Sequence, residues 1–86
     1  MTPYKNLGGD SGVTFYETYS DSIVVKFRDN STYTYTHSSA GREAVEHMKI
    51  LAATGRGLNA FINRWVKKAY ASKTSSGRSA NSGRYW

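Results

Sequence analysis

The sequence predicts an α+β fold in which a three-stranded antiparallel β-meander packs against two C-terminal helices. Residues 13–36 are rich in β-branched and aromatic side chains, and residues 44–70 carry apolar side chains at three- and four-residue spacing. The length of 86 residues suits one domain. We divide the chain into a flexible N-terminal arm at 1–11, a folded domain at 12–71 and a disordered basic Gly/Ser-rich tail at 72–86.

The three strands follow one another with short connections. We expect them at residues 13–19, 22–28 and 32–36, where apolar and polar side chains roughly alternate. Between the second and third strands, Asp29-Asn30 can adopt the left-handed backbone angles of a tight hairpin turn.

The length of this hairpin loop decides where the tyrosines of the third strand lie. A two-residue loop sets Lys26 opposite Tyr33, so that Tyr33 and Tyr35 share the face of Lys26. Exposed aromatic rings beside a cation would form a stacking platform for unpaired bases. A three-residue loop pairs Tyr33 with Phe27 and places it in the core, and packed rings are the usual arrangement for strand tyrosines.

Two helices complete the predicted domain. Ser38 or Ser39 can cap the first helix, and Gly55 ends it in the usual C-terminal role. The second helix runs from Leu58 to Tyr70. The predicted core draws apolar side chains from strands and helices: Phe15, Ile23, Val25, Phe27, Val45, Met48, Leu51, Leu58, Phe61, Ile62 and Trp65.

The positive charge of the chain is concentrated in its second half. Residues 1–46 hold four basic and six acidic side chains, a net charge of −2, whereas residues 47–86 hold eight basic side chains and no acidic one, a net charge of +8. Such a one-sided field attracts polyanions: nucleic acid first, an acidic protein surface second and anionic lipid third. The segregation favours partner binding over the alternative that a basic surface only aids solubility.

The predicted binding surface is centred on the second helix. Arg64, Lys67 and Lys68 lie opposite its apolar stripe, where cations can neutralise phosphates and release condensed counterions. A merely solvated polar face is the alternative. The full set of predicted binding residues also draws on the hairpin, the turn between the helices and the tail: Lys26, Tyr33, Tyr35, Arg56, Arg64, Lys67, Lys68, Lys73, Arg78 and Arg84.

The sequence offers little that could support catalysis or metal binding. His37 and His47 have no second ligand at metal-binding spacing, and the chain has no cysteine. The serines concentrate in the tail, where no base is held near them. We therefore expect a non-enzymatic cytoplasmic protein with no cofactor, metal, signal peptide or membrane partner.

Two short motifs resemble a known family. A Tyr-x-Tyr strand at residues 33–35 and a Gly-Arg-Gly-Leu-Asn-x-x-Ile segment at residues 55–62 are similar to the KTSC domain. This module is found at the C-terminus of some lysyl-tRNA synthetases and as small stand-alone bacterial or phage proteins. The matching positions are Tyr33, Tyr35, Gly55, Asn59 and Ile62. Leu58 stands where the family has an aromatic residue, and Ser39-Ala40-Gly41 replaces a proline that often begins the first helix.

The resemblance covers residues 12–71 and implies RNA binding, the function conjectured for the family. Together with the basic helix face and tail, it predicts a small nucleic-acid-binding module that prefers RNA to duplex DNA. No helix carries the Asn, Arg and Gln set that would discriminate bases in a major groove. The alternative is a protein-binding regulator, such as a phage-type inhibitor of a host enzyme, that uses the same basic surface on an acidic partner.

Overall fold

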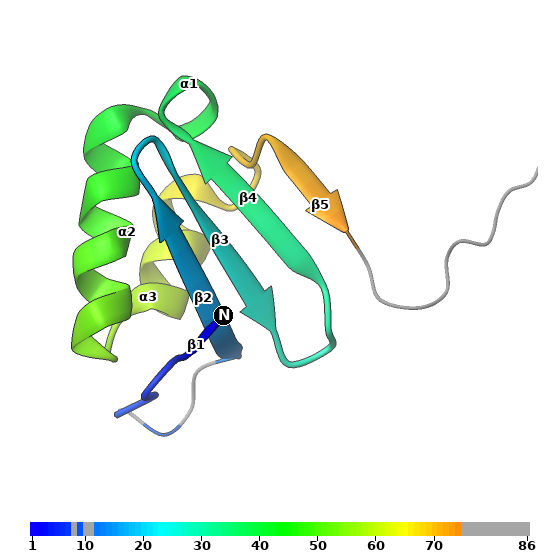
Figure 1. Cartoon of the computed structure of the whole chain (residues 1–86), viewed down its shortest axis with the longest axis vertical. Coiled ribbons are helices and arrows are strands. Elements are labelled where there is room, and N and C mark those ends of the chain that lie inside the picture. Colours follow the sequence, from blue (N-terminus) through cyan, green and yellow to red (C-terminus); the bar gives the residue numbers. More distant parts are fainter. Residues whose placement is uncertain (8, 10–11, 75–86) are drawn as a thin grey trace, which may run out of the picture.

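A five-stranded antiparallel sheet forms the front layer of the protein (Figure 1). The structure, a computed structural model, describes residues 1–7, 9 and 12–74. The α+β class is confirmed, with five strands rather than three. The strands lie in chain order across the sheet: β1 (Thr2–Pro3), β2 (Val13–Tyr19), β3 (Ser22–Phe27), β4 (Thr32–Thr36) and β5 (Ser72–Thr74).

The helices lie between β4 and β5 in the chain and cover one face of the sheet (Figure 1). They are α1 (His37–Ala40), α2 (Arg42–Thr54), α3 (Leu58–Phe61) and the π-helical segment η1 (Ile62–Val66). Thr36 caps α1, because its hydroxyl accepts a hydrogen bond from Ser39 N at 3.0 Å and Ser39 Oγ accepts one from Thr36 N at 3.0 Å. Gly55 ends α2 with a left-handed φ of 85°, as the sequence predicts.

Both outer strands lie in segments for which the sequence predicts no structure. Thr2 pairs with Tyr16 in β1, and the Tyr4 side chain is buried, so the N-terminal segment packs on the domain rather than forming an arm. At the other edge, Lys73 of β5 pairs with Tyr33, so the predicted tail begins with an edge strand. The rest of the tail, residues 75–86, lies outside the described residues.

The β3–β4 hairpin is paired in a register that neither predicted alternative gives. Lys26 pairs with Thr32, while Tyr33 lies opposite Val25 and Tyr35 opposite Ile23. Both tyrosines therefore point to the helix-covered face, and Lys26 to the other one. The connection uses the predicted turn residues, because Asn30 takes a left-handed φ of 70° and Asp29 Oδ1 accepts a hydrogen bond from Ser31 N at 2.9 Å.

Two aromatic residues of the predicted core lie on the surface. Trp65 is 67% exposed, because the wider turn of the π-helix rotates the residues that follow Ile62. Val66 takes the buried position instead. Phe15 is 37% exposed, because a β-bulge between Val13 and Phe15 shifts the pairing and sets Phe15 opposite Lys26.

The core lies between the helices and the sheet. Six predicted members are buried, and Phe27, Leu51 and Phe61 pack against them. The buried apolar set of the described chain is Tyr4, Val13, Ile23, Val25, Tyr35, Val45, Met48, Ala52, Leu58, Ile62 and Val66. None of the described helices is long and apolar enough to cross a membrane.

Candidate nucleic-acid interface

The segment from α3 through η1 is buried on one side and exposed to solvent on the others. Leu58, Ile62 and Val66 are buried, so the buried residues recur every four positions. Arg64 and Trp65 are exposed in this segment, and the predicted cations Lys67 and Lys68 are exposed in the turn directly after Val66. The structure therefore brings a large aromatic ring, predicted for the core, into the middle of the basic sequence.

Trp65 and Arg64 form one exposed pair on this segment. The Arg64 guanidinium carbon lies 6.0 Å from the centroid of the Trp65 ring, within the range of a cation–π contact. The ring stays 67% exposed beside this cation, so a large part of its surface is open to solvent. An exposed indole next to guanidinium and ammonium groups can stack a planar ring and attract the negative charge attached to it.

Trp65 also forms one wall of a shallow groove between α2 and the α3–η1 segment. The groove has a volume of about 560 Å³, and Ala40, Ala44 and Phe61 contribute to its apolar lining. His47 lies over the Phe61 ring, with the ring centroids 4.8 Å apart. The groove thus extends the apolar surface of Trp65 toward the first turns of α2.

A smaller cavity of about 250 Å³ lies on the other side of the segment, between η1 and the β3–β4 connection. Asn59, Asn63 and Lys67 line it from the helical side. These residues are spaced four apart, which sets them on one side of the segment. Lys67 therefore belongs to the cavity rim and does not share the outer position of Arg64 and Lys68.

The sheet supplies the opposite wall of this cavity as an aromatic cluster. Tyr33 packs edge-to-face on Phe27 at 5.3 Å and on Tyr70 at 5.0 Å, and it stacks on Tyr35 at 6.3 Å. The Lys73 ammonium lies 5.2 Å from the Tyr33 ring centroid, and hydrogen bonding to the Tyr33 side chain raises the pKa of Lys73. Lys73 therefore remains charged beside the aromatic cluster.

Tyr35 is fully buried in this cluster, which excludes it from an exposed stacking platform. Burial raises the pKa of the Tyr35 phenol to about 12, with smaller contributions from Tyr33 and Tyr70. Its hydroxyl is a buried polar atom with no hydrogen-bond partner among the described residues. The packed alternative for the strand tyrosines is therefore the observed one, although Tyr33 lies opposite Val25 and not opposite Phe27.

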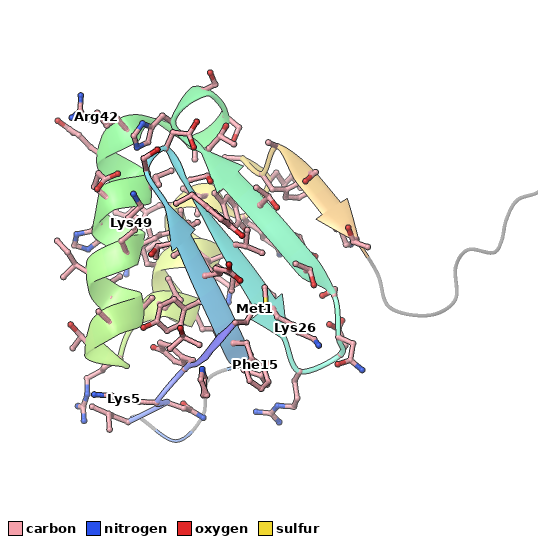
Figure 2. The ribbon with its side chains drawn as sticks, viewed as in Figure 1. Met1, Lys5, Phe15, Lys26, Arg42 and Lys49 are labelled. Atoms are coloured by element: carbon pink, nitrogen blue, oxygen red, sulfur yellow. The ribbon has the colours of Figure 1, made fainter. Side chains whose placement is uncertain are left out.

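The remaining predicted binding residues lie apart from this surface. Lys26 is on the sheet face that carries no helix in the described chain, with its ammonium 5.8 Å from the Phe15 ring centroid (Figure 2). Its predicted grouping with Tyr33 is wrong, because the observed register of the hairpin turns the two side chains to opposite faces. Arg56 is exposed in the turn between α2 and α3. Arg78 and Arg84 lie outside the described residues.

One ionic cluster serves the fold rather than this surface. Glu46 Oε2 accepts hydrogen bonds from Lys49 Nζ at 2.9 Å and contacts His37 Nε2 at 2.8 Å, which ties α1 to α2. The contacts with His37 and then Lys49 lower the pKa of the Glu46 carboxyl. Among the described residues, no group of three His, Asp or Glu side chains could hold a metal ion.

These features define the interface by position and chemistry. No family model, curated protein or solved structure matches the chain. The sequence did not predict that Trp65 is exposed, nor that Val66 is buried in the position expected for Trp65. The signal for this exchange is the four-residue spacing of Leu58, Ile62 and Val66, which competes in the sequence with the α-helical spacing that includes Trp65.

Proposed function

We propose that the protein binds single-stranded RNA through an interface made of Trp65, Arg64, Lys67 and Lys68. The observation that carries this proposal is the 67% exposure of Trp65 within residues 64–68, which hold three cations and no acidic side chain. A tryptophan ring on a basic surface combines base stacking with neutralisation of phosphates.

Single strands suit this interface better than duplex DNA. Bases must be unstacked to lie on the Trp65 ring, and single-stranded nucleic acid meets that requirement at low cost. The α-helical part of the segment is the four residues Leu58–Phe61, and Trp65 lies in the π-helical turn that follows. A segment this short offers little side-chain surface for discriminating bases in a major groove. Contacts with the backbone therefore supply most of the proposed affinity.

The test uses a fluorescein-labelled, unstructured RNA 12-mer and fluorescence anisotropy. Trp65→Ala should weaken binding roughly 5- to 150-fold, because stacking one base on an aromatic ring contributes about 1–3 kcal/mol. The triple substitution of Arg64, Lys67 and Lys68 by glutamate should abolish binding at low salt while leaving the circular dichroism spectrum unchanged. Wild-type affinity in both variants would overturn the proposal.

The opposite face of the sheet offers a matched control. Lys68→Glu and Lys26→Glu make the same change in net charge, but only Lys68 lies in the proposed interface. Lys68→Glu should reduce affinity several-fold more than Lys26→Glu. An equal loss in the two variants would mean that the RNA responds to net charge alone and uses no defined surface.

The groove beside Trp65 favours a second candidate function, the regulation of an acidic partner protein. Its lining by Phe61, Ala40 and Ala44 could accept apolar side chains while Arg64 and Lys68 meet acidic ones. The triple substitution removes this binding as well, so the two functions are separated by what co-purifies. If the protein binds RNA, the purified sample should show a raised 260/280 nm absorbance ratio. If it regulates a partner, one protein should co-purify in a stoichiometric amount.

Membership of the KTSC family would agree with either function. It rests on the five matching positions in the sequence. Three of them take structural roles here, because Tyr35 and Ile62 are in the core and Gly55 is the left-handed end of α2. The proposal of RNA binding depends on Trp65 and its cations and does not require the family relationship.

A further inference from the structure

A small cavity with a mixed polar and aromatic lining lies beside the proposed interface and shares Lys67 with it. Its volume of about 250 Å³ is below the range of about 300–1,000 Å³ found for pockets that hold drug-sized ligands. At roughly 30 Å³ per water molecule, the space equals that of about eight waters, which suits a single ring with its substituents. The lining therefore decides which ring it takes.

The two walls of the cavity differ in chemistry. The sheet side contributes the aromatic rings of Phe27, Tyr33 and Tyr35, and the helical side contributes the carboxamides of Asn59 and Asn63. A carboxamide offers both a donor and an acceptor, the combination that reads the edge of a nucleobase. Aromatic rings on one side and amide groups on the other are the two kinds of contact that hold an unstacked base.

The charges at the cavity favour a neutral ring over a free anion. Lys67 and Asp29 both line the cavity, so the negative charge of the Asp29 carboxylate offsets the positive charge of the Lys67 ammonium. The Asp29 Oδ1 atom already accepts hydrogen bonds from Ser31 N at 2.9 Å and Ser31 Oγ at 2.6 Å, and these bonds lower the pKa of the Asp29 carboxyl. Asp29 therefore stays negative at neutral pH and repels a bare phosphate from the cavity.

An unsatisfied polar atom belongs to the same wall. The Tyr35 hydroxyl is buried and has no hydrogen-bond partner among the described residues, a state that costs free energy. The hydroxyl has no surface open to the cavity, so a base gives it a partner only if the Tyr35 ring shifts toward the cavity on binding. The cost of the buried hydroxyl is then a cost of folding that binding recovers.

We infer that this cavity holds one unpaired nucleobase of the RNA, between the aromatic wall and the carboxamides of Asn59 and Asn63. The inference rests on the proposed function and adds a base-binding site to the phosphate- and ring-binding surface of η1. Lys67 joins the two, because it lines the cavity and lies in the basic segment next to Trp65.

The experiment uses uncharged nucleosides, which do not respond to the cations of the basic surface, and the positions of the shifted amides distinguish the cavity from stacking on Trp65. Uridine, cytidine, adenosine and guanosine are titrated separately into the ¹⁵N-labelled protein, and amide chemical shifts are followed. At least one nucleoside should shift the amides of Asn59, Asn63 and Tyr33 with a millimolar dissociation constant that does not change with salt. No shift from any nucleoside would overturn the inference.

Two neighbouring substitutions separate this inference from the proposed function. Asn63→Leu should weaken nucleoside binding by about fivefold, the value of one lost hydrogen bond, and leave the salt dependence of RNA binding unchanged. Arg64→Leu should leave nucleoside binding unchanged and weaken RNA binding. If RNA binds but Asn63→Leu retains full nucleoside affinity, the cavity is not the site. If nucleosides bind and RNA does not, the proposed function fails and the cavity remains a base site.

Tyr35→Phe gives a further readout that a purely structural role would not produce. Loss of the buried hydroxyl should raise the melting temperature and, at the same time, weaken nucleoside binding about fivefold. A variant that is more stable and binds the nucleoside at wild-type strength would remove the hydroxyl from the proposed site.

Discussion

The Tyr4 hydroxyl accepts a hydrogen bond from the backbone N–H of Leu58 at 3.2 Å, and both residues are buried. Leu58 is the first residue of α3, whose N-cap, Gly57, provides no side-chain hydrogen bond. The N-terminal segment therefore supplies the missing cap from 54 positions away in the chain. This contact holds the start of the segment that carries Trp65.

Tyr4→Phe should lower the free energy of unfolding by about 1–2 kcal/mol, because it leaves the Leu58 N–H buried without a partner. The measurement is urea denaturation followed by circular dichroism. Tyr19→Phe is the matched control, since the Tyr19 hydroxyl bonds Glu17 Oε2 at 2.8 Å on the exposed surface. Equal stabilities of the two variants would show that the N-terminal segment does not support α3.

Gly55→Ala should be more destabilising than Gly57→Ala, although both glycines have a φ of 85°. The positive φ costs about 1–3 kcal/mol for alanine at either position. At Gly55 the added Cβ would also lie 2.6 Å from Lys5 Cβ, whereas at Gly57 the nearest atom is Leu51 Cδ2 at an ordinary 3.7 Å. Thermal unfolding of the two variants measures the difference, and an equal loss of stability would contradict the packing of Lys5 on Gly55.

Val66→Ala should act mainly on stability, whereas Trp65→Ala should act mainly on RNA binding. Val66 is buried, so its truncation should cost about 2 kcal/mol of unfolding free energy. Trp65 is 67% exposed, so its truncation should cost about 1 kcal/mol or less and act mainly on RNA binding. Denaturant titration distinguishes the two. A larger loss of unfolding free energy for Trp65→Ala would show that the indole is packed in the core, as regular α-helical spacing predicts.

Tyr35→Phe should raise the free energy of unfolding by about 1 kcal/mol at neutral pH, because it removes a buried hydroxyl without a partner. Burial raises the pKa of Tyr35 to about 12, so the unfolded chain loses this proton at lower pH than the folded one. The stability of the wild-type protein is therefore unaffected by ionisation of Tyr35 below about pH 10. It falls as the pH rises from there toward 12, because the unfolded chain ionises first.

The pH dependence can be measured by comparing wild type with Tyr35→Phe. The advantage of the variant should grow by about another 1 kcal/mol by about pH 11. Tyr35→Phe removes one phenol and leaves the other tyrosines unchanged, so the difference between the two proteins isolates Tyr35. Parallel stability curves from neutral to alkaline pH would show that the Tyr35 phenol ionises as readily in the folded state as in the unfolded one.

Local patterns in the sequence account for the central part of the fold. The apolar stripe and the terminal glycine of α2 are both local, and the α2 helix was predictable for that reason. The short outer strands β1 and β5 were not, because strands of two or three residues form only when a neighbouring strand offers its edge. Their pairing depends on contacts between distant parts of the chain.

The candidate site was predictable in its charge but not in its geometry. The cations of the second helix stand out in the sequence, whereas the exposure of Trp65 depends on one π-helical turn that ordinary helical spacing does not include. The faces of Lys26 and Tyr33 depended on the length of one loop, since a shift of one residue turns every side chain to the other side of the sheet.

The salt dependence of RNA binding tests the central claim most directly. The dissociation constant of the labelled RNA 12-mer is measured by anisotropy for wild type, Lys68→Glu and Lys26→Glu. If Arg64, Lys67 and Lys68 each contact a phosphate, wild-type affinity should fall roughly 20-fold between about 50 and about 200 mM salt. Lys68→Glu should lower the slope of log affinity against log salt by about 0.7, and Lys26→Glu should leave it unchanged. RNA affinity that does not depend on salt, or a slope that Lys68→Glu leaves unchanged, would contradict the account.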